Sequence, residues 1–330
     1  MSSWLGRLSN GWRSYWFAPQ SAVELSLIRL TFFGYLYYRY SWPTADYKLL
    51  SEKSGLFKPV SFFTLGLEVP SYDALLTIYA VFSISLLFTC IGLFTRTSAA
   101  CAFLTGLFIW GLRQNFGKYT GGGVDGVVIA MSVYAFARSG DYLSIDHWLK
   151  KAAYNPRKLK SAASNLLRSP PPPSGEYRWP VRFGWLVFFC FYTTAGVSKL
   201  TTTGWDWALS DNLKYLLIRH HYSHFPPTTL GLWVAQYPWL YKGLGLSTLF
   251  AESLCLLGLL HPWARALFAI SLLSMQFGIY LTLGVQFMGV FAMGWLLVPW
   301  EPLLMLVTRR RKRLVGDRGV STGQCVSDAA

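Results

Sequence analysis

Residues 74–94 read ALLTIYAVFSISLLFTCIGLF, an apolar run without a single charged side chain. An α-helix needs about 20 predominantly apolar residues to cross the hydrocarbon core of a bilayer, so this run is long enough to span a membrane. Other runs that are long enough, or nearly so, occur at 23–41, 98–113, 124–139, 181–200, 243–260, 264–283 and 285–307. The sequence therefore predicts an all-α protein, a polytopic transmembrane bundle of about eight spanning helices.

The composition favours a membrane protein over a nucleic-acid-binding one. Hydrophobic residues make up 53% of the chain and charged residues only 14%, whereas soluble domains usually carry about 25% charged residues. The net charge of +15 would suggest nucleic acid in a soluble protein. In a membrane protein, basic residues instead mark cytoplasmic loops and contacts with anionic headgroups. We therefore expect the lipid bilayer as partner and no nucleic acid, and the oligomeric state stays open.

The distribution of lysine and arginine sets the expected orientation and the domain boundaries. The loop 140–180 and the tail 308–330 are rich in basic residues, and the positive-inside rule places both in the cytoplasm. Alternation of the spans then puts the N-terminal segment 1–22 in the cytoplasm and the loop 201–242 outside, with the membrane domain covering 23–307. The tail is also rich in glycine and serine, which predicts disorder. The lack of a cleavable signal and of paired extracytoplasmic cysteines is compatible with a bacterial inner membrane.

Several polar side chains lie inside the apolar runs, where each needs a partner or a function. Glu252 lies too deep in its helix to reach the interface, so we expect it to be protonated or paired inside the bundle. Glu24 and Arg29 are predicted to form an interfacial pair. For Gln276, a hydrogen bond to a neighbouring helix is the favoured interpretation. Asp125 follows three glycines, and an exposed acid at the start of a helix is slightly favoured over a ligand contact.

Residues 195–200 read AGVSKL and place Lys199 at the outer end of the fifth predicted span. A lysine in this place is usually an anchor that reaches toward the headgroups. A partly desolvated lysine, however, has a lowered pKa and can act as a base, and nearby histidines could relay protons. The loop that follows supplies further polar and aromatic groups on the same side: Trp205, Arg219, His220, His221 and His224. The five cysteines and these histidines give at most a weak metal signal, so no metal site is predicted.

The motifs over about residues 24–300 resemble, in their order, the HTTM family, the membrane domain shared with vitamin K-dependent gamma-carboxylases. The AGVSKL segment followed by Trp205 is similar to an AGVKKL-type segment followed by tryptophan in the carboxylases. The segment 215–220 is similar to their YL-x-RH element, with one extra residue here. Further similarities are Leu27-Ile28-Arg29, Gly92-Leu93-Phe94-Thr95-Arg96, Ser144-Ile145-Asp146 and Glu252.

The resemblance implies a role for Lys199, because the matching lysine of the carboxylases is the base that deprotonates vitamin K hydroquinone. A quinone cofactor or another lipid-soluble ligand follows by the same resemblance. The candidate catalytic residues are then Lys199, His220 and Glu252, and the candidate substrate contacts are Trp205, Arg219, His221, Gln276 and Asp125. Gly122-Gly123 stand where the carboxylases have an Asn-His pair, and Gln276 stands where they have a histidine. Gamma-carboxylation itself is therefore not expected.

The sequence leaves three classes of function open. The first is a carboxylase-like membrane enzyme in which Lys199 and the loop histidines surround an outer pocket. The second is a non-catalytic transporter or accessory subunit, which predicts a polar path through Glu252, Gln276 and Asp125. The third is a purely structural membrane protein whose polar groups are all satisfied by their neighbours.

Overall fold

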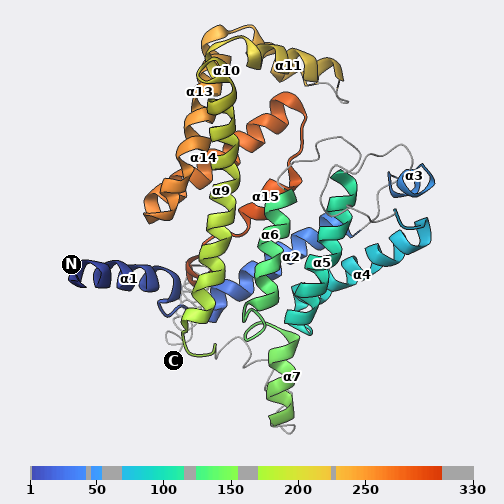
Figure 1. Cartoon of the computed structure of the whole chain (residues 1–330), viewed down its shortest axis with the longest axis vertical. Helices are drawn as coiled ribbons and strands as arrows, with labels where there is room; N and C mark the ends of the chain where they lie inside the picture. The colour runs from blue at the N-terminus through green and yellow to red at the C-terminus, as the bar shows by residue number, and fades with distance from the viewer. Residues whose placement is uncertain are drawn as a thin grey trace, which may run out of the picture.

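The chain is described by a computed structural model, which covers residues 2–41, 46–53, 69–114, 124–154, 170–223 and 228–306. Within these residues the fold is entirely helical apart from an isolated antiparallel bridge between Gln20 and Ser174. The elements, most of which are labelled in Figure 1, are α1 (Ser2–Phe17), α2 (Ala22–Tyr40), α3 (Asp46–Glu52), α4 (Tyr72–Ile91), α5 (Thr95–Gln114), α6 (Val124–Phe136), α7 (Ile145–Tyr154), η4 (Gly175–Tyr177), α9 (Arg178–Thr203), α10 (Asp206–Leu209), α11 (Asn212–Ser223), α12 (Thr229–Ala235), α13 (Pro238–Leu254), η5 (Cys255–Leu259), α14 (Pro262–Leu283) and α15 (Met288–Gly294).

Four of the described helices are long and apolar enough to cross a membrane: α4, the continuous helix Gly175–Thr203, the continuous helix Pro238–Leu259, and α14. The all-α prediction is confirmed, and four candidate spans support a membrane protein, but the count of about eight is not confirmed. Helices α2 and α5 have 19 and 20 residues, yet both carry charged side chains that lower their apolar content. The disordered tail predicted at 308–330 lies outside the described residues.

The eighth predicted span, at 285–307, is not one continuous helix. The structure has the seven-residue helix α15, then turns at 295–298, and a short helix at 300–306. Pro299 separates the two helical pieces, because proline has no backbone N–H and disfavours helical geometry in the residue before it. The second piece starts at the carboxylate of Glu24, which accepts hydrogen bonds from the backbone N–H groups of Trp300 (3.2 Å) and Glu301 (2.7 Å).

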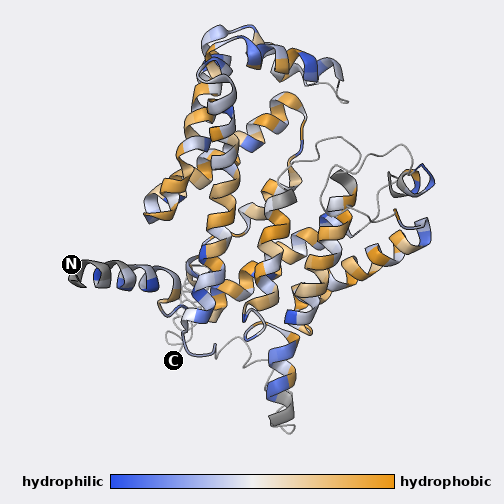
Figure 2. Cartoon of the chain, viewed as in Figure 1, coloured by the Kyte–Doolittle hydropathy of each residue, from blue (hydrophilic) through white to orange (hydrophobic). Residues whose placement is uncertain are grey.

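The long helix α9 runs through the middle of the molecule and packs against both α13 and α6 (Figure 1). Hydrophilic residues gather on α7 and α11 at opposite ends, whereas the helices between them are mainly hydrophobic (Figure 2). Many large apolar side chains point outward, as expected for helices whose surroundings are lipid. Examples are Ile84, Leu104, Phe136, Leu267 and Ile270.

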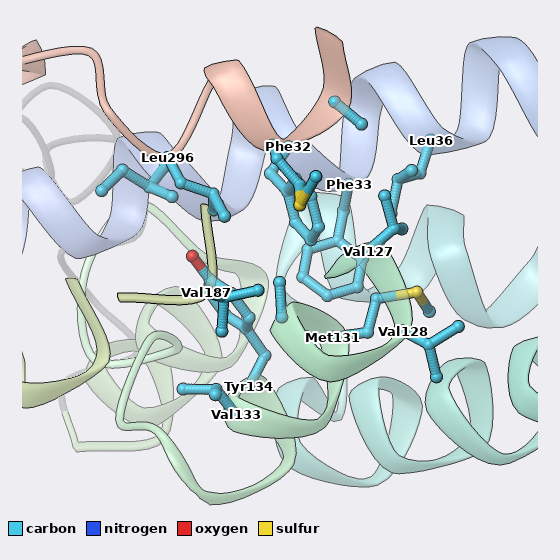
Figure 3. Close-up of a cluster of buried hydrophobic side chains, with 14 of the residues drawn as sticks. Phe32, Phe33, Leu36, Val127, Val128, Met131, Val133, Tyr134, Val187 and Leu296 are labelled. Atoms are coloured by element: carbon cyan, nitrogen blue, oxygen red, sulfur yellow. The ribbon is translucent and has the colours of Figure 1, made fainter. Parts of the chain in front are cut away.

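The main core lies where α2, α6 and α9 meet (Figure 3). Phe32 and Phe33 of α2 pack against Tyr134 of α6, with ring centroids 6.0 and 5.1 Å apart. Met131 and Val187 close the cluster and are also buried. Such dense aromatic packing makes this half of the molecule the scaffold on which the other helices are placed.

A polar network ties together three turns at the α7 end of the molecule. The carboxylate of Asp146 accepts hydrogen bonds from the Phe94 and Thr95 backbone N–H groups, both at 2.8 Å, and from Thr95 Oγ1 at 2.6 Å. It therefore caps the start of α5. Gly92 has a φ of +74°, and a Cβ there would lie 2.4 Å from Ser144 Cβ and 2.6 Å from an Arg29 nitrogen. Only glycine fits this turn.

Arg29 belongs to the same network, so the predicted Glu24–Arg29 pair is wrong. The guanidinium is fully buried and donates to the carbonyl oxygens of Ser139 (2.7 Å) and Leu143 (2.5 Å). Glu24 binds the backbone at 300–301 instead. Both charged groups thus take hydrogen-bond partners from the main chain of remote segments rather than from each other. Three of the segments that carry the HTTM resemblance, around Arg29, Gly92 and Asp146, meet here.

Replacing Asp146 by Asn should destabilise the protein at neutral pH. Burial raises the pKa of Asp146, but its hydrogen bonds from Thr95 and Phe94 outweigh burial and hold the pKa below the ordinary value of 3.8. A carboxyl with a lowered pKa stabilises the folded state above the unfolded-state pKa, and this stabilisation is lost as the pH falls through the lowered value. Thermal unfolding in detergent should give a lower melting temperature for Asp146→Asn than for the wild type at neutral pH. This difference in melting temperature should become smaller below about pH 4.

Asp73 provides the control for this experiment. It is an exposed carboxylate in the first turn of α4, and Asp73→Asn should change the unfolding free energy by less than about 0.5 kcal/mol. Equal losses in the two variants would show that the hydrogen bonds of Asp146 are not the cause.

Candidate functional site

A cavity of about 600 Å³ lies between α9, α11, α13 and α14, a volume in the range of small-molecule sites. Most of its wall is apolar. The apolar part is lined by Leu213, Leu216, Leu217, Val234, Leu244, Met275, Ile279, Leu283, Val285 and Phe287. The polar part consists of Lys199, His220, Glu252 and the hydroxyl groups of Ser247, Thr248, Ser271, Ser274 and Thr282. The three candidate catalytic residues therefore line one cavity.

The strongest polar interaction in the cavity wall joins α9 to α13. Lys199 Nζ donates a hydrogen bond to Glu252 Oε2 and forms an ion pair with it. The Glu252 side chain is only 6% exposed and the Lys199 side chain 24%, so the pair is largely removed from solvent. The expectation that Glu252 is paired inside the bundle is thereby confirmed. The Lys199 ammonium also lies 4.7 Å from the ring centroid of Trp207, within cation–π range.

Gly196 explains how the two charged groups come together. A Cβ at this position would lie 2.7 Å from the Ser253 backbone nitrogen and 2.8 Å from Glu252 Cβ. The backbones of α9 and α13 therefore make their close approach at Gly196, and residues three apart on a helix share a face. Lys199 follows on that face and meets Glu252. The AGVSKL segment is thus a small-residue contact followed by an ion pair.

His220 reaches the cavity because α11 is held against the N-terminal half of α13. Tyr241 of α13 donates a hydrogen bond of 2.5 Å to Asp211, just before α11. This hydrogen bond lowers the pKa of Asp211 below its ordinary value. Gly245 of α13 lies close to Ala208 of α10, where a Cβ would be 3.1 Å from the Ala208 Cα. These contacts fix the position of α11, and with it the position of His220.

The other candidate residues in the 205–221 region do not line the cavity. Trp205 is exposed and packs against Phe250, with ring centroids 5.8 Å apart. Arg219 is exposed on α11. His221 Nδ1 lies 3.2 Å from the Thr228 carbonyl oxygen, across residues that the structure does not describe. Trp205 and His221 therefore contact neighbouring residues, and Arg219 faces the surroundings of the protein.

Two more candidate residues, Gln276 and Asp125, are not part of the described cavity wall. Gln276 is buried on α14 next to Met275, but it is not part of the cavity wall, and its Oε1 accepts no hydrogen bond from the described residues. Asp125 is in the first turn of α6, and its side chain lies outside the described residues, as does His224. The polar path that a transporter would need from Glu252 through Gln276 is not formed by the cavity.

The sequence reasoning missed several lining residues. Trp207 rather than Trp205 faces the lysine, because the chain turns at Gly204, which has a φ of +63°. The missed hydroxyl groups follow helical spacing: Ser271 and Ser274 lie three residues apart on α14, and Ser247 and Thr248 lie one turn before Glu252. A search for small and hydroxyl residues at this spacing around a buried acid could have found them.

No protein-family model, curated protein or solved structure matches this chain. The similarity in motif order to the HTTM family therefore stays a prediction. Among the residues that the structure describes, no group of three or more His, Cys, Asp or Glu side chains gathers as a metal site would require. The acidic and basic groups that line the cavity are the Lys199–Glu252 pair and His220.

Replacing Gly196 by Ala should separate α9 from α13. The added methyl group meets backbone and Cβ atoms, and overpacking of this kind usually costs about 1–3 kcal/mol. Gly243→Ala is the matched control, because Gly243 is an exposed glycine of α13 where an added Cβ would have no atom within 4 Å. It should stabilise the helix by about 0.5–1 kcal/mol. Unfolding in detergent measures both, and a loss in Gly243→Ala as large as that in Gly196→Ala would contradict the close approach.

A double-mutant cycle should reveal the ion pair. Lys199→Met and Glu252→Gln each remove one partner and leave the other group without its counter-charge, which in buried pairs costs about 3–5 kcal/mol. The 24% exposure of the Lys199 side chain should reduce this to about 2–3 kcal/mol. The double variant should be more stable than the sum of the two losses implies. Strict additivity would show that the two residues do not interact.

Proposed function

We propose that the chain is an HTTM-type integral membrane protein that binds a quinone, or a similar lipid-soluble small molecule, in the cavity between α9, α11, α13 and α14. Lys199 acts as a proton acceptor at the polar end of the ligand. The observation that carries this proposal is an ion pair, Lys199–Glu252, in the wall of an otherwise apolar cavity of about 600 Å³. We place the protein in a bacterial inner membrane, with about eight membrane crossings and both termini in the cytoplasm; the last crossing is made by α15 and the short helix at 300–306 together.

The wall of the cavity supports a ligand with a long apolar part and a compact polar head. Leucine, isoleucine, valine, methionine and phenylalanine side chains from the surrounding helices would cover the apolar part. Burying a charged pair is unfavourable unless further polar groups satisfy it. A quinone or hydroquinone oxygen provides such a group, because it can accept a hydrogen bond from the ammonium or donate one to the carboxylate. Trp207, beside Lys199, offers an aromatic face to the head group.

The ion pair constrains how Lys199 can work as a base. An ammonium has no free lone pair, so Lys199 must first pass a proton to its hydrogen-bonded partner Glu252, and His220, which lines the same cavity, can carry that proton onward. The neutral amine then accepts the proton of a hydroquinone hydroxyl. The O–H bond breaks, a new N–H bond forms, and the oxyanion remains beside the ammonium. Glu252 keeps the amine in position throughout.

Binding of a short-chain quinone should depend on Lys199. A hydrogen bond to a charged group contributes about 1.5–3 kcal/mol, so Lys199→Ala should weaken binding roughly 10- to 100-fold in calorimetric titrations of the detergent-purified protein. Lys242→Ala is the control, since Lys242 is on α13 but not part of the cavity wall. Unchanged binding in Lys199→Ala would overturn the proposal.

The role as base has its own readout. A bound hydroquinone that loses its proton should show the ultraviolet absorption of the anion in a difference spectrum of the wild type. Lys199→Ala should bind any remaining hydroquinone without that band. Mass spectrometry of lipid-soluble molecules that co-purify with the wild type identifies the natural ligand. A variant that only unfolds more easily, with ligand binding intact, would identify Lys199 as a structural anchor.

A further inference from the structure

Three arginines gather at the end of α9 that is remote from the cavity. Arg178 is the first residue of α9 and Arg182 the fifth, and Arg265 is in the first turn of α14. The Cζ atoms of Arg182 and Arg265 lie 4.3 and 3.7 Å from the ring centroid of the same residue, Trp185. Two guanidinium groups thus lie within cation–π range of one indole ring.

Helix α1 closes this arginine cluster (Arg178, Arg182 and Arg265) from the side. Arg178 Nε donates a hydrogen bond of 2.9 Å to the Tyr15 carbonyl oxygen, and Arg182 Cζ lies 4.6 Å from the centroid of the Tyr15 ring. The next residue, Trp16, has a buried Nε1 that finds no acceptor among the described residues. Helix α1 therefore contacts two of the three arginines, and it carries a buried indole N–H that has no acceptor among the described residues.

Among the residues that the structure describes, no carboxylate neutralises the cluster. None of the three arginines forms an ion pair with a carboxylate of the described residues. Like charges brought together in a half-buried place repel one another, and an anion would relieve the repulsion. Among common anions, phosphate and carboxylate groups have oxygen atoms whose arrangement best matches the donors of a guanidinium group.

The surroundings of the cluster favour a phosphate that belongs to a lipid. Both α9 and α14 begin candidate membrane spans, and headgroups lie where spans begin. Next to Arg265 on α14, Trp263 is 80%, Leu267 64% and Ile270 67% exposed. Acyl chains can cover this apolar surface while the phosphate stays on the arginines. A soluble phosphate compound would leave these side chains uncovered.

We propose that Arg178, Arg182 and Arg265 form a binding site for the phosphate group of an anionic phospholipid. Helix α1, with exposed Trp12 and Phe17, lies along the membrane surface beside it. The site is separate from the cavity, because Arg182 and Lys199 are about 25 Å apart along α9 at 1.5 Å per residue. It rests on insertion of α9 and α14 in a membrane but not on the identity of the cavity ligand.

Native mass spectrometry of the full-length protein, with phosphatidylglycerol and phosphatidylcholine added in equal amounts, tests the proposal. The wild type should retain phosphatidylglycerol preferentially. Arg182→Gln/Arg265→Gln removes two cations, and at about 1 kcal/mol for each cation near a lipid surface the preference should fall roughly 30-fold. The control Arg39→Gln/Arg96→Gln removes the same charge from two exposed arginines elsewhere and should keep the preference. An unchanged preference in the first double variant would overturn the site.

Two further arms separate the remaining explanations. Arg182→Lys/Arg265→Lys keeps the charge and the fold but not the planar forks, so it should retain only part of the preference. Full retention would show that charge alone acts and that no shaped site exists. Inorganic phosphate at millimolar concentration should leave bound phosphatidylglycerol in place. If inorganic phosphate displaces the lipid, the site serves a soluble phosphate and the lipid assignment is wrong.

Discussion

The ion pair between Lys199 and Glu252 is the contact on which the arrangement of the C-terminal helices depends. It joins α9 to α13 at the place where Gly196 lets their backbones approach. In an apolar environment neither charged group can leave the other without a large loss of free energy. The pair therefore fixes the relative position of the two helices, and the cavity forms between them and the two other helices packed alongside, α11 and α14.

The two halves of the molecule satisfy their buried charges in different ways. In the half built on α2, α4, α5 and α6, Arg29 and Asp146 bind backbone groups of tight turns. These groups hold turns together and, among the described residues, line no large apolar cavity. In the other half, Lys199 and Glu252 bind each other in the wall of the cavity of about 600 Å³. The second arrangement is therefore the one that has room for the proposed ligand.

The sequence predicted the parts of the fold that depend on apolar content alone. The runs at 74–94, 181–200, 243–260 and 264–283 became candidate spans. The depth of Glu252 in its run predicted that it is either protonated or paired, and the structure shows the pair with Lys199. What it could not predict were contacts set by the geometry of distant turns. Arg29 binds carbonyl groups 110 and 114 residues away, and no local pattern encodes such a distance.

At the site, the backbone at Gly204 decides that Trp207 rather than Trp205 faces the lysine. The break in the eighth predicted span also depends on a distant contact. The sequence stays apolar on both sides of Pro299, and the start of the new helix is marked by its hydrogen bonds to Glu24.

The two charged features of α9 together give a direction to the proposed chemistry. The arginine cluster is at the start of the helix and the ion pair near its end. If anionic lipid and the positive-inside rule hold the arginines at the cytoplasmic surface, the cavity and His220 belong to the outer half of the membrane. A proton released through His220 then leaves on the side opposite the arginines. Lipid binding at one end of α9 would thus orient proton transfer at the other.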